Sequence, residues 1–295
     1  PEAIVDLTSL FVKDTTDTKI LIDLAECYKL MGSPRQAADY YRKAVSLRPN
    51  NKFFRLQYIR SLLNAENFKE ARDACHGWLE QDTVSATGYK YLGQAYEGMQ
   101  DIPNAFFSYN VAYRRDSLDA QTVARIANIF NNNRQFTDAI DVTECYRLSD
   151  TTSVDVNRQN AKAYCMLKDY KKAIERYESL KRMGDRSFLT FYYLGISYYG
   201  DNWFYGSYDN LKEAYAKNST DINVLYYYAK SCSRTSWKKE GVEFMEKAVE
   251  IATPGDSILE RLYKGLAECY GYAGESYKKI CLLYTSPSPR DPKTS

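Results

Sequence analysis

The sequence Leu-Ala-Glu-Cys-Tyr at residues 24–28 recurs letter for letter at residues 266–270. Two related segments, Leu-Gly-Gln-Ala-Tyr at residues 92–96 and Leu-Gly-Ile-Ser-Tyr at residues 194–198, keep the leucine, a small second residue and the final tyrosine. Residues 24 and 92 are 68 positions apart, and residues 92 and 194 are 102 apart, so both separations are multiples of 34. A fixed interval of this length is typical of proteins built from one repeated supersecondary unit.

The same register continues between these segments, in repeats that begin at residues 18, 52, 86, 120, 154, 188 and 222. Position 8 is Ala25, Ile59, Gly93, Ala127, Ala161, Gly195 and Ala229, and position 20 is Ala37, Ala71, Ala105, Ala139, Ala173, Ser207 and Gly241. Position 11 is Tyr28, Leu62, Tyr96, Phe130, Tyr164, Tyr198 and Cys232. Small residues let two antiparallel helices approach closely, and a bulky residue fills the adjoining space. The pattern therefore predicts two helices of about 13 residues in each repeat.

The first repeat carries a resemblance to a known family in Leu24, Ala25, Tyr28, Gly32, Ala37, Tyr41, Ala44 and Pro49. These residues resemble the tetratricopeptide repeat (TPR) pattern, and the likeness extends over about residues 1–280. The resemblance implies an all-α fold, a right-handed α-solenoid of stacked antiparallel helix pairs (the TPR superhelix). It also implies a non-catalytic scaffold or adaptor that binds a peptide or protein segment in its concave groove.

The register divides the chain into four parts. Residues 1–17 are expected to form the second helix of a truncated repeat, because Ala3 falls on position 20 of the register continued backwards. Residues 18–255 hold seven 34-residue repeats, and residues 256–280 hold a partial eighth repeat. Residues 281–295 resemble a translated sequencing adapter, which predicts a non-native tail and favours a bacterial source. A genuine Ser/Pro-rich tail is the alternative.

Composition argues against several classes of protein. The 295 residues include 40 Lys and Arg and 38 Asp and Glu, a net charge of +2 that is too balanced for a general nucleic-acid binder. His76 is the single histidine, and the seven cysteines form no Cys-x-x-Cys pair, so we expect no metal, no cofactor and no enzymatic activity. No apolar run approaches the roughly 20 residues of a membrane span. Unpaired cysteines favour the cytoplasm, whereas a leader upstream of residue 1 would direct the protein to the periplasm.

The resemblance also places a binding surface. In TPR arrays the first helices of the pairs line the concave groove with positions 2, 5, 6, 9, 12 and 13, which the helical period puts on one face. In the later repeats these positions are basic, amide-rich and tyrosine-rich. We expect them to bind a protein segment with acidic groups, because tyrosine offers contact area and arginine recognises carboxylates. The candidate residues are Arg125, Asn128, Asn132, Arg158, Gln159, Lys162, Tyr192, Tyr193, Tyr199, Tyr226, Tyr227, Lys230 and Arg234.

Three alternative interpretations stay open at this point. The tyrosines would pack between neighbouring helices and stiffen the array, while Arg125, Arg158 and Lys162 would belong to an ordinary solvated face. The array would be the regulatory region of a larger enzyme whose catalytic domain lies outside these residues. A helical-repeat code for RNA is the third interpretation, and the near-neutral charge disfavours it.

Overall fold

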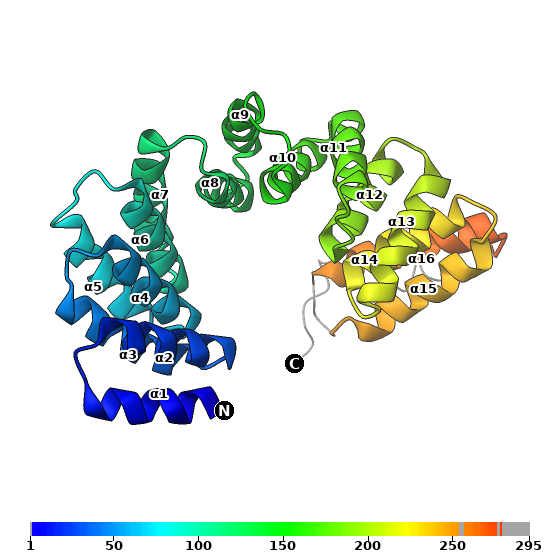
Figure 1. Cartoon of the computed structure of the whole chain (residues 1–295). Coiled ribbons are helices and arrows are strands. Elements are labelled where there is room, and N and C mark those ends of the chain that lie inside the picture. The colour runs from blue at the N-terminus through cyan, green and yellow to red at the C-terminus, as the bar shows by residue number, and fades with distance from the viewer. Residues whose placement is uncertain (1, 254–256, 276–277, 279–295) are drawn as a thin grey trace, which may run out of the picture. The chain divides into compact units, whose positions relative to one another are not determined.

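The computed structural model describes residues 2–253, 257–275 and 278, and this part of the chain contains sixteen α-helices and no strand (Figure 1). The fold is an all-α helical repeat solenoid, as the 34-residue period predicts. The adapter-like segment at 281–295 lies outside the described residues, as do residues 276–277 and 279–280 of the expected eighth repeat.

The helices alternate between two positions in each repeat. The first helices, which we call A helices, are α2 (Thr18–Leu30), α4 (Lys52–Asn64), α6 (Ala86–Gly98), α8 (Ala120–Asn132), α10 (Val154–Met166), α12 (Phe188–Gly200), α14 (Ile222–Ser233) and α16 (Ile258–Ala273). The second helices, which we call B helices, are α1 (Glu2–Lys13), α3 (Pro34–Leu47), α5 (Phe68–Leu79), α7 (Ile102–Arg115), α9 (Phe136–Arg147), α11 (Tyr170–Arg182), α13 (Phe204–Lys217) and α15 (Lys238–Ile251). From α2 to α14 the A helices begin 34 residues apart, which is the interval found in the sequence.

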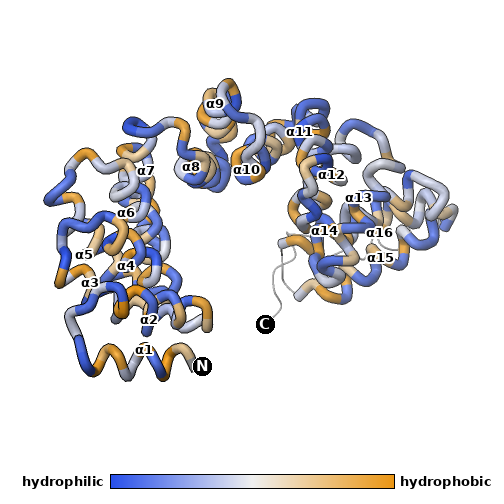
Figure 2. The backbone as a smooth tube through the Cα atoms, in the orientation of Figure 1, coloured by the Kyte–Doolittle hydropathy of each residue, from blue (hydrophilic) through white to orange (hydrophobic). Residues whose placement is uncertain are grey.

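The helices group into two compact units, residues 1–129 and 130–295, and α8 crosses the boundary between them. Each helix contacts the next along the chain from α1 to α7 in the first unit and from α9 to α16 in the second. A helices also contact A helices of the next repeat, α4 with α6 in the first unit and α10, α12, α14 and α16 in turn in the second. Figure 2 shows hydrophobic and hydrophilic residues interspersed along the helices, as expected when each helix buries one face.

Short polar residues and a left-handed residue set the ends of the helices. Asn51 accepts hydrogen bonds at 3.0 and 3.2 Å from the N–H groups two and three residues further on, and Asp221 does the same at 2.9 and 3.0 Å. The turn after an A helix contains a residue with φ between 57° and 71° at one repeat position: Gly32, Glu66, Gln100, Arg134, Lys168 and Asn202. This conformation ends the A helix and turns the chain back to form the B helix.

Small residues lie where the two helices of a pair cross. Ala37, Ala105 and Ala173 are completely buried, which confirms the expected packing role of position 20. At position 8 of the third repeat, a Cβ atom on Gly93 would lie 2.6 Å from the ring of Tyr109, which is closer than a real carbon contact. The ring of Tyr109 on α7 therefore packs directly against the backbone of α6.

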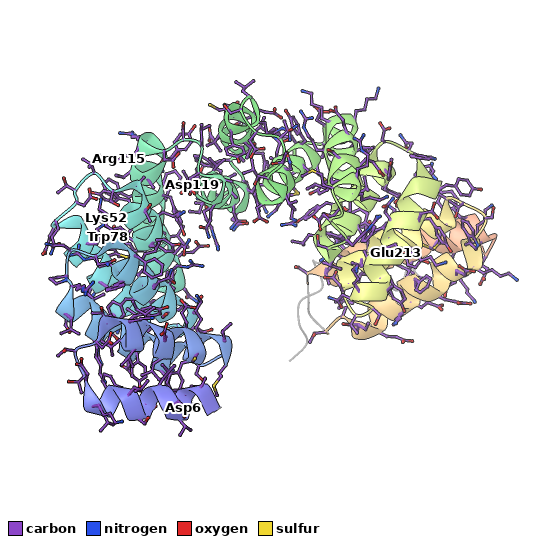
Figure 3. All side chains as sticks on the ribbon, in the orientation of Figure 1. Asp6, Lys52, Trp78, Arg115, Asp119 and Glu213 are labelled. Atoms are coloured by element: carbon purple, nitrogen blue, oxygen red, sulfur yellow. The ribbon has the colours of Figure 1, made fainter. Side chains whose placement is uncertain are left out.

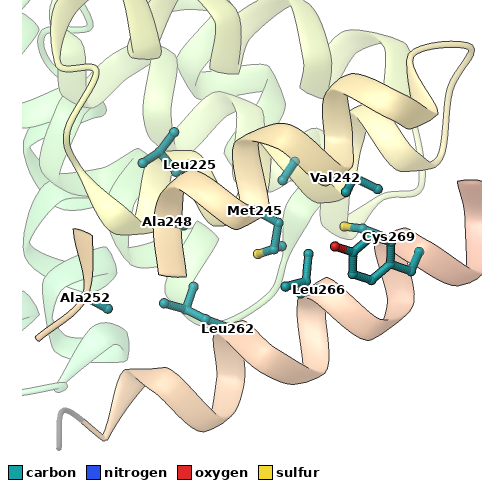
Figure 4. Close-up of a cluster of buried hydrophobic side chains, with 10 residues drawn as sticks. Leu225, Val242, Met245, Ala248, Ala252, Leu262, Leu266 and Cys269 are labelled. Carbon is teal, nitrogen blue, oxygen red and sulfur yellow. The ribbon is translucent and has the colours of Figure 1, made fainter. Parts of the chain in front are cut away.

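Several core clusters are each shared by three successive helices. One cluster joins α14, α15 and α16 through Leu225, Met245 and Leu266, among others (Figure 4). A second joins α10, α11 and α12, and a third joins α4, α5 and α6. Since apolar burial stabilises in proportion to the area removed from water, each repeat is stabilised chiefly by its immediate neighbours.

We expect Gly93→Ala to lower the free energy of unfolding by about 1–3 kcal/mol, because the new Cβ must displace the buried ring of Tyr109. Gly77→Ala is the matched control. Gly77 is exposed within α5, and nothing lies within 4 Å of its added Cβ, so alanine should stabilise this helix by up to about 1 kcal/mol. Urea unfolding followed by circular dichroism measures both. Equal unfolding midpoints for the two variants would contradict the close packing of α6 on α7.

Candidate functional site

The structure divides the predicted surface residues between the two units. Arg125 and Asn128 lie on the part of α8 that belongs to the first unit, where Arg125 forms an ion pair with Glu97 at 3.0 Å and Asn128 is half-buried. Asn132 and all the later candidates belong to the second unit. In that unit α10, α12, α14 and α16 contact one another in turn. The candidate side chains on these four helices, with those at the end of α8 and directly after α14, form what we call the A-helix surface.

Two tyrosines of the A-helix surface are anchored by rings beneath and beside them. The ring of Tyr192 stacks on Phe188 with centroids 5.7 Å apart and meets Tyr193 edge-on at 5.0 Å. Tyr193 in turn stacks on the fully buried Tyr177 of α11 at 6.2 Å. Burial raises the pKa of both surface hydroxyls, so they stay protonated near neutral pH. Both residues are half-buried, and part of each ring stays accessible.

Three further tyrosines connect α12 to α14. Tyr227 meets Tyr199 of α12 edge-on at 6.0 Å, and it meets its neighbour Tyr226 edge-on at 5.2 Å. The ammonium group of Lys230 lies 5.4 Å from the ring centroid of Tyr226 and 5.6 Å from that of Tyr199. A cation in this position is attracted by the negative face of an aromatic ring. Three rings and one ammonium group thus form the centre of the A-helix surface.

Helix α16 adds three residues that the sequence analysis did not single out: Arg261, Glu268 and Tyr272. Glu268 forms an ion pair with Lys230 at 3.0 Å, the guanidinium of Arg261 lies 4.6 Å from the ring centroid of Tyr226, and that of Arg234 lies 5.3 Å from the ring centroid of Tyr272. Burial works to lower the pKa of Lys230, but Glu268 and the two tyrosines raise it above the usual value. Lys230 is therefore a cation already paired within the protein.

Arg158 is likewise neutralised inside the second unit. Its guanidinium pairs with Asp185 at 2.9 Å and with Asp155 at 2.7 Å. The side chain of Asp185 is only 6% exposed and also accepts a hydrogen bond from Thr190 at 2.7 Å. Burial acts to raise the pKa of Asp185, but the hydrogen bonds from Thr190, Ser187 and Arg158 bring it below the usual value. These contacts tie α10 to the turn that precedes α12.

Amide groups connect the end of α8 to α10. The side-chain nitrogen of Asn131 donates to the backbone oxygen of Gln159 at 3.0 Å and to its side-chain oxygen at 3.1 Å. Lys162 donates to Asn132 at 3.3 Å, and burial lowers its pKa. Within the part of the chain that the structure describes, no carboxylate forms an ion pair with Lys162. Lys162 is thus a half-buried cation that a carboxylate of a partner would stabilise.

In residues 2–253, 257–275 and 278, no group of three His, Cys, Asp or Glu side chains is placed to hold a metal ion. Burial raises the pKa of Cys165 and Cys269 to about 11, so these thiols stay protonated and are poor nucleophiles. No described helix is long and apolar enough to cross a membrane.

Comparison with known proteins agrees with the repeat geometry. A tetratricopeptide repeat family model matches residues 18–51, which span α2, α3 and the turn after them. The fold is similar to that of a tetratricopeptide repeat protein from Parabacteroides merdae ATCC 43184, with a TM-score of 0.57 and 12% identity over 85% of this chain and 98% of that one. The chain thus contains a tetratricopeptide repeat at residues 18–51 within a helical repeat solenoid.

Two other solved structures have similar folds. YrrB, described as a TPR protein with an unusual peptide-binding site, has a TM-score of 0.54 and 14% identity over 64% of this chain and 96% of its own. The pilF protein of Pseudomonas aeruginosa has a TM-score of 0.61 and 14% identity over 76% of this chain and 97% of its own. At these identities the likeness concerns the fold alone. A sequence search of curated proteins finds no match.

The ion pair at Asp185 generates a prediction about acid stability. Because the folded pKa of Asp185 is depressed, its contribution to the TPR fold is present above the unfolded carboxyl pKa and is lost as the pH falls through the folded pKa. We expect Asp185→Asn to lower the free energy of unfolding by about 2 kcal/mol at neutral pH. The difference from wild type should shrink as the pH falls below about 4.

Asp155→Asn is the matched control, because Asp155 contacts the same arginine but its side chain is 74% exposed. We expect it to change the free energy of unfolding by less than about 1 kcal/mol. Urea unfolding at a series of pH values measures both variants. If Asp185→Asn lowered the free energy of unfolding equally at all pH values, or if Asp155→Asn lowered it by the same amount, the buried ion pair would not be the source of the stability.

Proposed function

We propose that this protein is a non-catalytic scaffold that captures a segment of another protein on its A-helix surface. The observation that carries the proposal is the cluster of half-buried tyrosines on α12 and α14, with cations over their rings. Tyrosine and arginine are the side chains that dominate binding energy at protein interfaces. Rings already held by neighbouring rings lose little conformational entropy when a partner covers them.

The charges on the A-helix surface indicate which of its cations are free to bind acidic groups of the partner segment. Arg158 and Lys230 form ion pairs within the second unit, so the proposal gives them a role in positioning the surface rather than in binding an acidic partner. Arg234 is exposed and Lys162 is half-buried, and neither forms an ion pair within the described residues. We therefore assign the acidic groups of the partner to Arg234 and Lys162, at the two flanks of the tyrosine cluster.

Two further considerations support a protein partner. The chain has 40 basic and 38 acidic residues, whereas a nucleic-acid-binding surface relies on a marked excess of lysine and arginine. The structural likeness to YrrB, whose description names a peptide-binding site, shows that a similar fold carries such a site in another protein. The partner of this chain is therefore proposed to be a peptide or protein rather than an RNA or DNA.

Selection of random displayed peptides on the full chain tests the proposal. We expect peptides that bind the wild type to lose at least about tenfold in affinity at Tyr226→Ala, as truncation of a central interface aromatic usually causes. Tyr226→Phe should keep most of the affinity, because the ring contacts stay in place. Tyr193, Tyr226 and Tyr227 all pack against buried clusters, so the comparison of Tyr226→Ala with Tyr226→Phe must be made on variants that circular dichroism shows to be folded.

Phe107→Ala is the control for this experiment. Phe107 is an aromatic residue that is 65% exposed and lies on the B helix α7, outside the A-helix surface. Fluorescence polarisation of labelled peptides gives the affinities, and circular dichroism checks that each variant is folded. Failure to enrich any peptide, or peptides that bind Tyr226→Ala as tightly as wild type, would count against the A-helix surface.

A further inference from the structure

A hollow of about 700 Å³ lies on the other side of the second unit, between the B helices α11 and α13 and over α12. The half-exposed and exposed groups around it are not part of the A-helix surface. Phe191 and Tyr198 of α12 are buried beneath it, and Trp203 and Tyr205 stand at one end. Glu213, which is labelled in Figure 3, lies along the α13 wall.

Trp203 is a large apolar side chain held rigidly in an exposed position. Its relative exposure is 55%, although its ring meets that of Tyr198 edge-on at 4.6 Å. A Cβ atom on Gly206 would lie 2.9 Å from the indole ring. The indole is thus seated on the first turn of α13, where a glycine makes room for it, while much of its surface faces solvent.

The repeat position that Trp203 occupies holds a polar residue in each of the first five repeats. The residue at this position, directly before the B helix, is Ser33, Asn67, Asp101, Gln135 or Asp169 in the first five repeats and Trp203 or Trp237 in the next two. Asp101 and Asp169 cap their helices, and an indole has no acceptor with which to do so. Tyr205 is also exposed and meets Trp237 edge-on at 5.9 Å. Trp203 and Tyr205 both line the hollow, and with Trp237 they are called the aromatic strip.

The polar groups around the hollow are balanced in charge. They are Glu178, Lys181, Arg186, Asp209, Lys212 and Glu213. Glu178 accepts from Tyr198 at 2.8 Å and from Lys181 at 3.3 Å, so the deeper groups bond to one another. Asp209, Lys212 and Glu213 are exposed on α13, beside the aromatic strip. The hollow thus offers both hydrogen-bond donors and acceptors, with no excess of either charge.

The equivalent hollow in the first unit lacks these features. It lies between α3 and α5, has a volume of about 400 Å³, and has Asn67 at the position of Trp203. There Glu70 accepts from the hydroxyl of Tyr58 and from the amide of Asn67, both at 2.5 Å. Glu70, Tyr58 and Asn67 therefore satisfy one another's hydrogen bonds. The hollow between α3 and α5 has the same place in its repeats as the hollow between α11 and α13, but it contains no exposed indole. The exposed indole is therefore a feature of the second hollow and not of every groove between B helices.

We propose that the hollow between α11 and α13 binds a neutral oligosaccharide. A pyranose ring has an apolar face of C–H groups, which stacks on an aromatic face, and a rim of hydroxyl groups that both donate and accept hydrogen bonds. Trp203 and Tyr205 supply the faces, Asp209 and Glu213 accept from hydroxyls, and Lys212 donates to them. A proline-rich segment would also suit an aromatic strip, but it has few donors for the two carboxylates, so the sugar accounts for more of the site.

An array of immobilised neutral oligosaccharides, of gluco, manno, galacto and N-acetylglucosamine type, tests this proposal with the full chain. We expect retention of at least one of these types, with affinity at least about tenfold lower for Trp203→Ala. Gly206→Ala should weaken retention as well, since its Cβ displaces the indole without removing it. Phe107→Ala is the control, because Phe107 is 65% exposed but lies in the first unit, and it should bind like wild type.

The same array carries a proline-rich peptide and acidic oligosaccharides as competing probes. Retention of the proline-rich peptide in a manner that depends on Trp203, without retention of sugars, would overturn the proposal in favour of a peptide groove. Wild-type protein that retains none of the neutral sugars, or a Trp203→Ala variant that retains them undiminished, would also overturn it. Circular dichroism of Trp203→Ala and Gly206→Ala shows whether a loss arises from unfolding. Because the site is separate from the A-helix surface, Tyr226→Ala should leave sugar retention unchanged.

Discussion

The structure depends on the close approach of the two helices within each repeat. Gly93 lies against the ring of Tyr109, and a Cβ on Gly195 would lie 2.5 Å from the buried side chain of Leu211. Such contacts set the distance between the axes of the A and B helices in a pair. That distance determines how the next repeat packs against both helices. Because several core clusters each join three successive helices, a change in one pair is felt by its neighbours first. In the second unit this packing positions both the A-helix surface and the hollow between the B helices α11 and α13.

Much of the fold could be predicted from the sequence, because small and bulky residues recur at fixed repeat positions and these positions decide the helix crossings. The left-handed residue in each turn could not be predicted in the same way. Glycine and asparagine mark such turns, and only Gly32 and Asn202 are of these types, whereas Glu66 and Lys168 adopt the same conformation. At these positions the packing of the flanking helices overrides the preference of the side chain.

The candidate site could be predicted only in part. The helical period placed the tyrosines and cations on one side of the A helices, but it gave no information on their partners. Arg158 pairs with Asp185 in the following turn, and Lys230 pairs with Glu268 on α16. Such partners are 27 and 38 residues away in sequence, and whether they meet depends on side-chain directions between repeats. These ion pairs hold neighbouring elements together, and partner binding by the same surface is the function proposed above.

The A-helix surface and the hollow between α11 and α13 differ in whether their charged groups form ion pairs within the second unit. On the A-helix surface the helices contact one another directly, and Arg158 and Lys230 strengthen those contacts. Between α11 and α13 a hollow remains, and Asp209 and Glu213 face it without an ion pair among the described residues. The Trp203 indole packs on Tyr198 and on the first turn of α13, yet more than half of its side chain stays exposed. Natural proteins break local rules chiefly at functional sites, which is why an exposed indole beside two unpaired carboxylates supports the proposed ligand site in the hollow.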